Sequence, residues 1–342
     1  MVSRIKVILV LALFVGVPGW KAYAQPAAIK INAGAVGVMG DAPFYVGLAK
    51  GFYEEQGVQV ELNHFRSGGT MMAPLGAGKL DVVRGGVNIG LFNSFARGWP
   101  VRVVAAGTVD RPGNSPDAFL VRPDLKDQIK TPRDLKGRKI AVNAPASAMI
   151  YVLAKALEKA GLSLKDVDMV TLPFGEMGAA LRNKAIDVAL GVEPSASLLA
   201  ERGDVVIWKR VPDFVSDPYF QVSILFYNND WATKNPQAAR GFMLGWIKSV
   251  RYYYEAANKG PNRAEVVNIL TRYTTVKEAP VYDKVHWSVI DPNGLILKDS
   301  INDQQEFYFR SGYVKQKADV DKMIDNSYLD YALEKLGRYP TR

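Results

Sequence analysis

The chain has 342 residues, of which 48% are hydrophobic and 23% charged, so it is long enough for two domains and can bury a large core. It contains no cysteine, which excludes disulfides, iron–sulfur clusters and thiol nucleophiles. Its two histidines, His64 and His286, lie far apart, so we expect neither a metal site nor a catalytic histidine. The formal charge is +9, but the densest basic stretch, 122–139, holds three acids and no aromatic residue. This stretch predicts a solvated face rather than a nucleic-acid site.

The first 24 residues have the layout of a secretory signal peptide. Arg4 and Lys6 precede an apolar run over 7–17, and the small-residue motif 22–24 follows. The run is too short to cross a bilayer, which needs about 20 apolar residues. A buried N-terminal helix or strand would explain neither the basic start nor the small residues. We expect cleavage after Ala24, export to the periplasm, and no lipid anchor, because no cysteine follows the run.

Strands alternate with helices in the first part of the mature chain. Apolar segments predict strands at 28–33, 58–62, 81–83 and 101–106, and each of the first three is followed by a glycine-bearing loop and a helix start. Asp41 is placed to cap the first of these helices, because a carboxylate accepts hydrogen bonds from free backbone N–H groups. Short buried strands separated by helices predict a parallel α/β sheet.

The same pattern restarts after a polar, proline-bearing stretch at 110–116. Strands are predicted at 139–142, 169–172, 188–192 and 205–208, followed by a returning strand at 220–227 and a strong helix at 235–257. The fold class is therefore α/β with two lobes, each a mainly parallel sheet flanked by helices, and a helical C-terminal region. We place the first lobe at 25–113 and 216–342 and the second at 114–215, with hinges near 110–118 and 215–222.

Catalytic motifs are missing from the sequence. There is no GxSxG, no HExxH and no P-loop, and the glycines at 34–40 have the spacing GxxGxxG rather than that of a dinucleotide fingerprint. By contrast, the predicted helix starts of both units follow strand ends, where parallel α/β sheets bind ligands. Their free N–H groups suit anions and polar head groups. For any one of these residues, ordinary helix capping is the favoured interpretation. Their joint placement predicts a cleft between two lobes.

Several stretches resemble one family of proteins. They include APFYVGLAKGFYEEQGVQVEL (42–62), LGAGKLDVV (75–83), FARGWPVRVVAA (95–106), TPRDLKGRKIAV (131–142), ALEKAGLSLKDVDMVTL (156–172), IDVALGVEP (186–194) and WATKNPQAARGF (231–242). In this order the chain resembles the periplasmic solute-binding proteins of ABC importers, in the nitrate/sulfonate/taurine-binding family that includes thiamine-precursor and aromatic-acid binders. The resemblance implies the two-lobe periplasmic binding protein fold (type II), with two strands crossing between the lobes, a small-molecule ligand and a membrane permease as partner.

The resemblance also implies a set of ligand contacts. Carried over by position, they are Asp41, Phe44, Gly69, Thr70, Val87 and Asn88 in the first lobe, Ser147, Ala148, Phe174 and Glu193 in the second, and Arg111, Tyr219 and Gln221 at the crossings. If Asp41 and Glu193 face the cleft, a zwitterion or a heterocycle with an N–H donor is favoured. If they only cap helices, Arg111 and the helix ends suit a carboxylate or sulfonate. The sequence leaves both alternatives open.

The leading hypothesis is a monomeric, non-enzymatic binding component of an importer, without cofactor, that captures a sulfonate, a carboxylate or aromatic acid, or a similar small solute. Binding of a pyrimidine-type thiamine precursor is an alternative, as is delivery of the ligand to a receptor instead of a permease. A thiamine-precursor synthase is a third possibility, but such enzymes depend on a cysteine-rich motif that this chain lacks.

Overall fold

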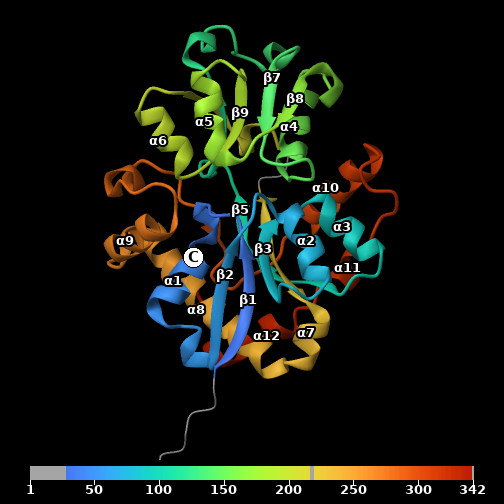
Figure 1. Cartoon of the computed structure of the whole chain (residues 1–342), viewed down its shortest axis with the longest axis vertical. Coiled ribbons are helices and arrows are strands. Elements are labelled where there is room, and N and C mark those ends of the chain that lie inside the picture. The colour runs from blue at the N-terminus through green and yellow to red at the C-terminus, as the bar shows by residue number, and fades with distance from the viewer. Residues whose placement is uncertain (1–27, 216–218, 341–342) are drawn as a thin grey trace, which may run out of the picture.

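The computed structural model describes residues 28–215 and 219–340, and it forms two lobes stacked along the long axis (Figure 1). The predicted signal peptide and its cleavage site lie outside the described residues. None of the helices in the described ranges is both long and apolar enough to cross a membrane.

The first lobe is built on a five-stranded sheet in the order β2-β1-β3-β12-β4. Its strands are β1 (Ile29–Ala35), β2 (Val58–His64), β3 (Val82–Gly86), β4 (Val101–Ala106) and β12 (Ser223–Asn228). β1 pairs in parallel with β2 and β3, whereas β12 is antiparallel to both β3 and β4. Four strands therefore run in one direction and only β12 is reversed.

The second lobe repeats this arrangement with the order β10-β6-β9-β7-β8. Its strands are β6 (Asp117–Val121), β7 (Lys139–Val142), β8 (Asp168–Thr171), β9 (Val188–Val192) and β10 (Val206–Arg210). Here β6 is the reversed strand, because it is antiparallel to β9 and β10, while β7 pairs in parallel with β8 and β9. Each sheet is thus mainly parallel, as predicted, with one strand that runs against the others.

A small three-stranded sheet joins the lobes. β5 (Thr108–Asp110) leads out of the first lobe and β11 (Phe220–Gln221) leads back into it, and β13 (Val289–Ile290) pairs with β5 on its other edge. The two reversed strands, β6 and β12, directly follow these crossings. Their direction is therefore a consequence of how the chain enters each lobe.

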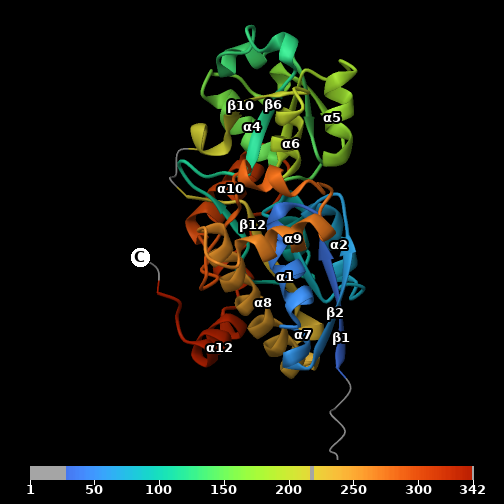
Figure 2. The same ribbon diagram turned by 90° about the vertical axis from the view of Figure 1, so that its left-hand side faces the viewer.

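Helices cover both sheets (Figures 1 and 2). The second lobe carries α4 (Met149–Glu158), α5 (Phe174–Arg182) and α6 (Ser195–Glu201). The first lobe carries α1 (Ala42–Lys50), α2 (Gly68–Gly76), α3 (Ile89–Ala96), α7 (Asn229–Lys234), α8 (Pro236–Ala257), α9 (Arg263–Tyr273), α10 (Lys298–Arg310), α11 (Val320–Met323) and α12 (Ser327–Leu336). The C-terminal region is helical, as the sequence predicts.

The predicted long helix forms the core of the first lobe. The side chains of Phe242, Trp246, Val250 and Tyr253 lie on one face of α8 and are fully buried. Phe44 on α1 contacts Trp246 with ring centroids 5.1 Å apart in an edge-on arrangement. Aromatic packing of this kind adds to the burial of apolar area, so α1 and α8 are fixed against each other.

Several strands differ from the sequence prediction. β5, β6 and β13 were not predicted; β5 and β6 flank the polar stretch 110–116, which dominates the local composition. β3 continues to Gly86, although Gly85 and Gly86 were predicted to lie in the loop before the next helix. A Cβ on Gly85 would lie 2.6 Å from Cα of Gly68, so only glycine lets the start of α2 rest on this strand.

We predict that Trp246→Ala lowers the free energy of unfolding by about 3–5 kcal/mol, because it leaves a large cavity in a fully buried cluster. Urea unfolding followed by circular dichroism measures this. Leu295→Ala, at a side chain that is 44% exposed, is the control and should stay within about 0.5 kcal/mol of the wild type. Equal losses in the two variants would contradict the proposed core.

Candidate functional site

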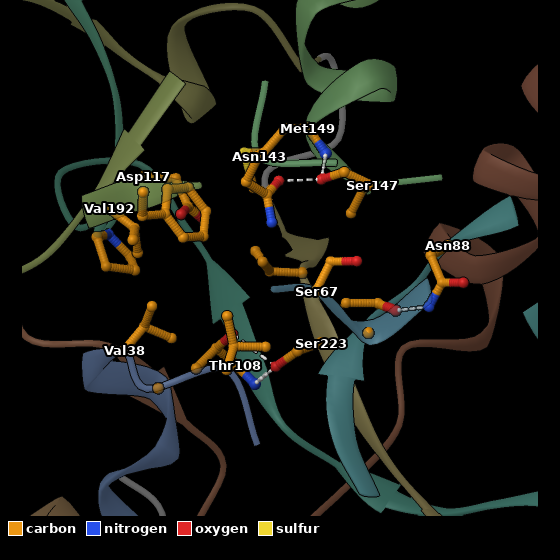
Figure 3. A pocket seen from close by; sticks show the side chains of 18 of the residues that line it. Val38, Ser67, Asn88, Thr108, Asp117, Asn143, Ser147, Met149, Val192 and Ser223 are labelled. Carbon is orange, nitrogen blue, oxygen red and sulfur yellow. Dashed lines mark hydrogen bonds between the residues drawn. The ribbon is translucent and has the colours of Figure 1, made fainter. Parts of the chain in front are cut away.

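A cavity of about 60 Å³ lies between the two lobes (Figure 3). We call it the interlobe cavity. It is lined by Val36, Val38, Gly40, Ser67, Gly68, Arg84, Gly86, Asn88, Thr108, Pro116, Asp117, Asn143, Ser147, Ala148, Met149, Phe174, Val192, Val222, Ser223 and Ser288. Most of these residues follow or end β1, β2 and β3 in the first lobe and β7, β8 and β9 in the second, and the others lie within β3 or near the crossings between the lobes. The cavity therefore lies where the carboxyl ends of the strands of both sheets face each other, the usual ligand position in such folds.

Four helices begin at this cavity, two from each lobe. α2 and α3 begin beside Ser67 and Asn88, and α4 and α5 begin beside Ala148 and at Phe174. Ser67 Oγ accepts a hydrogen bond from Thr70 N, and Asn88 Oδ1 accepts one from Leu91 N at 3.0 Å.

The caps of α2 and α3 use only the third N–H of each of these two helices. In α4 the N–H of Met149 donates to the hydroxyl of Ser147 at 3.1 Å, and the N–H of Ile150 donates to the carbonyl of Ser147. The first N–H groups of a helix have no partner within it, and the helix dipole places partial positive charge there. The dipoles of all four helices therefore point at the cavity, and the first N–H groups of α2 and α3 suit a small anion.

Arg84 and Asp41 form a buried ion pair beneath the cavity. Arg84 Nη1 lies 3.0 Å from Asp41 Oδ1, and the side chains are 5% and 0% exposed. Arg84 Nη2 also donates to the hydroxyls of Thr108 and Ser223, at 3.0 and 2.6 Å. A Cβ on Gly40 would lie 2.1 Å from this nitrogen, so glycine is required for the guanidinium to lie there.

The expectation that Asp41 caps α1 is wrong. Its Oδ2 accepts hydrogen bonds from the N–H groups of Val36, Gly37 and Val38, at 3.1, 2.8 and 3.0 Å, and its side chain makes no capping bond to α1. The carboxylate therefore fixes the loop that precedes it in the chain. Since its other oxygen pairs with Arg84, its charge is neutralised within the first lobe.

Glu193 in the second lobe has a similar environment. It is fully buried, accepts hydrogen bonds from the N–H and hydroxyl of Ser197, and pairs with Arg210 at 2.9 Å. It lines a second cavity, of about 270 Å³, which shares Val36, Val38, Phe174 and Val192 with the interlobe cavity. Its backbone oxygen accepts a hydrogen bond from Met39 N of the first lobe at 3.2 Å, so this residue also ties the lobes together.

Two further acids lie at the outgoing crossing. Asp110 and Asp117 are 1% and 3% exposed, and the hydroxyl of Ser115 donates to Asp110 at 2.6 Å. Burial raises the pKa of Asp117 to about 7, although Arg84 and Arg210 oppose the shift. Burial, and then the neighbouring Asp117, raises the pKa of Asp110 well above its usual range. Only Asp117 of this pair lines the interlobe cavity.

Four of the predicted contact residues line the interlobe cavity: Asn88, Ser147, Ala148 and Phe174. Two more lie close to it without lining it. Gly69 faces the second lobe, where an added Cβ would be 3.0 Å from Cβ of Ala146, and Thr70 is exposed and bonds Ser67. Asp41 and Glu193 are buried in the ion pairs described above.

The remaining predicted contacts lie elsewhere. Phe44 and Val87 are fully buried in hydrophobic clusters, and Gln221 is buried with its amide bonded to the backbone of Thr108, Ser223 and Leu297. Arg111 is exposed and lines a separate cavity beside Tyr253, and Tyr219 is 50% exposed. We do not propose these five residues as ligand contacts.

Several lining residues escaped sequence analysis, notably Arg84, Asp117, Thr108, Asn143 and Ser223. Arg84 did carry a signal, because a cation inside the otherwise apolar segment 82–86 must be paired when it is buried. Asn143 donates to the carbonyl of Arg66 at 3.0 Å and accepts from Ser147, so it links a loop of each lobe. That role depends on the lobes meeting, which local sequence does not reveal.

The fold and the site together define a two-lobe binding protein of the periplasmic type. The chain belongs to the NMT1/THI5-like family, whose model matches residues 40–259.

The chain is also similar to individual proteins. It is 28% identical over 231 residues to a protein of Brucella abortus described as a binding protein. The match covers 67% of this chain and 66% of the length of that protein, so the chain spans just under two thirds of it. It is 26% identical over 309 residues to a protein of Bacillus subtilis described as an aliphatic sulfonates-binding protein, covering 86% of this chain and 85% of that one. A bicarbonate-binding protein of Synechococcus is 23% identical, over 70% of this chain and 56% of that one.

Solved structures show the same fold. The periplasmic aliphatic sulphonate binding protein SsuA of Escherichia coli superposes with a TM-score of 0.68 at 21% identity, over 90% of this chain and all of that one. The periplasmic nitrate-binding protein NrtA of Synechocystis PCC 6803 gives a TM-score of 0.72 at 17% identity, over 92% and 90% of the two chains. The desulfurization enzyme DSZB shares the fold too, with a TM-score of 0.63 at 13% identity, over 90% and 99%. The fold therefore serves both binding proteins and enzymes.

We predict that Arg84→Met lowers the free energy of unfolding by about 3–5 kcal/mol, because it leaves the Asp41 carboxylate buried without its partner. Lys30→Met is the control, since it breaks an ion pair with Glu61 whose side chains are 60% and 53% exposed, and it should cost less than about 1 kcal/mol. Urea denaturation of both variants makes the comparison, and a small loss for Arg84→Met would refute the assigned role of the pair.

Proposed function

We propose that this protein is the solute-binding component of an ABC importer and that it closes its two lobes on a small oxyanion-bearing solute. The observation that carries the proposal is the convergence of four helix N-termini, two from each lobe, on one cavity. An anion at this point would contact both lobes at once, so its binding energy would favour the closed form. Release to a permease would follow from reopening.

The relatives support an oxyanion. Their descriptions name aliphatic sulfonates, bicarbonate and nitrate, and each of these anions has three oxygens around one central atom. Backbone N–H groups at helix starts are suited to such oxygens without strong dependence on the central atom. The cavity wall formed by Val36, Val38 and Val192 adds an apolar side, which suits an organic substituent.

We propose binding without catalysis. In the described part of the chain, none of the hydroxyls lining the interlobe cavity is hydrogen-bonded to a histidine or a carboxylate, which nucleophilic catalysis requires. Ser147 donates to the amide of Asn143, and Thr108 and Ser223 pair with each other and with Arg84. The hydroxyls of these three residues therefore serve in fixed polar networks.

We further propose that the mature protein begins at Gln25 and acts as a monomer in the periplasm, with a permease and an ATPase as partners. Genes for a permease and an ATPase next to the gene for this protein would support its role in an importer. A receptor gene there, without those two, would favour a sensor-type binding protein.

We predict that a screen of sulfonates, carboxylates, nitrate and bicarbonate finds at least one compound that raises the melting temperature, since a ligand stabilises the fold by RT ln(1 + [L]/Kd). Ala148→Phe should abolish this shift, because its ring would occupy the cavity. Ala179→Phe, on the exposed side of α5, should retain it. Absence of any shift in the wild type would contradict the proposed function.

We predict that the ligand found in that screen reduces the radius of gyration in X-ray scattering, because closure brings the lobes together about the crossings. Gly69→Val should weaken binding at least tenfold and reduce compaction, since its side chain would collide with Ala146. Ala73→Val, on the exposed face of the same helix, should behave like the wild type. If both valine variants close and bind normally, the contact at Gly69 does not limit closure.

A further inference from the structure

The lining of the interlobe cavity includes a buried aspartate, Asp117, one of whose carboxylate oxygens has no hydrogen-bond partner among the described residues. Asp117 lies at the start of β6 and is 3% exposed. Its Oδ2 has no hydrogen-bond partner among the described residues. The neighbouring Ser115 contacts the backbone of Asp117 and not its carboxylate: its hydroxyl donates to the carbonyl of Asp117 and accepts from the N–H of Asp117. A buried polar atom without a partner costs free energy, so its persistence in a cavity wall indicates a partner that arrives with the ligand.

Arg84 presents the complementary group. Its two terminal nitrogens are engaged by Asp41, Thr108 and Ser223, but its Nε is buried and has no partner in the described ranges. Arg84 and Asp117 both line the cavity and interact electrostatically. The lining of the cavity therefore includes a residue of the first lobe with an unused donor and a residue of the second lobe with an unused acceptor, together with helix ends that attract an anion.

We infer that Asp117 is a specificity-determining residue, which selects anions that carry their own hydrogen-bond donor, such as an ammonium or hydroxyl group, over anions of equal size without one. This inference rests on the proposed function, because it concerns the same cavity. The anionic oxygens lie at the helix N-termini and Arg84 Nε, and the donor of the ligand faces Asp117 Oδ2. A ligand without a donor would close the lobes over an unpaired carboxylate, which disfavours it.

The charged groups around Asp117 come from four elements. Arg84 on β3 and Arg210 on β10 favour its ionised form and Glu193 beside β9 disfavours it, while Asp117 itself disfavours the ionised form of Asp110 on β5. With burial as the largest cause, its pKa is raised to about 7. The carboxylate that accepts from an ammonium group is therefore more populated at pH 8 than at pH 6, and selectivity should rise between these values.

The test uses two sets of isosteres that differ in one group: taurine, isethionate and propane-1-sulfonate, and glycine, glycolate and propionate. In each set the substituent is ammonium, hydroxyl or methyl. Calorimetric titration of the mature chain at pH 8 should rank them in that order in at least one set, with the ammonium ligand binding about 10- to 100-fold more tightly than the methyl ligand. At pH 6 the ratio should fall.

Asp117→Val should bring the ratio close to one, and Asp117→Asn should lower it and remove its dependence on pH. Asp110→Asn is the matched control, since Asp110 is equally buried in the same crossing but does not line the cavity, and it should keep the wild-type ratio. Circular dichroism melting of each variant identifies any that fail to fold, and Asp117→Asn keeps the side-chain volume if Asp117→Val does not fold.

The outcomes distinguish failure of the role assigned to Asp117 from failure of the proposed function. If the methyl ligands bind as tightly as the ammonium ligands, or if Asp117→Val retains the wild-type ratio, the role of Asp117 is refuted while anion binding stands. If none of the six compounds binds, and nitrate and bicarbonate do not bind either, the proposed function itself fails.

Discussion

The architecture of the site depends on the direction of the strands. In each sheet four strands run the same way, and their carboxyl ends face the other lobe across the interlobe cavity. The one reversed strand in each sheet, β6 or β12, follows a crossing, so the chain changes lobe without disturbing the direction of the others. Helix starts then gather on both sides of the gap because an α-helix follows β1, β2 and β3 in the first lobe and β7, β8 and β9 in the second.

The electrostatic potential in the cavity depends on which of the nearby acidic side chains are neutralised by ion pairs. Asp41 and Glu193 look like an acidic pair in sequence, but each is buried against an arginine of its own lobe. They therefore neither repel an anion nor require a cation. Among the described residues that line the cavity, Asp117 is the one acid, and it lies with the paired Arg84 and the partial charges of four helices. On our proposal the helix ends bind the anion, and Asp117 adds a preference for anions that carry a donor.

Sequence periodicity predicted most strands and the long helix α8, because burial of one face imposes a regular spacing of apolar residues. It missed β5 and β6, whose pairing depends on partners far along the chain. The same limit applied to the site: Asn88 and Ser147 were predicted to contact ligand because they stand at helix starts, whereas Asp117 and Asn143 gain their positions only when two lobes meet. Phe44, although next to a helix start, points into the core because its neighbour α8 offers aromatic rings there.

The carboxylate of Asp41 has a consequence for how the solute can be held. Its Oδ2 gathers the three N–H groups of the loop 36–38, which in another protein would be available to a guest molecule. The Asp41 carboxylate thus takes the place of an oxyanion at this loop, and we expect the loop to keep its shape whether or not a solute is bound. The solute is then recognised by the other helix starts. The loop 36–38 after β1 serves as a fixed surface against which the second lobe closes.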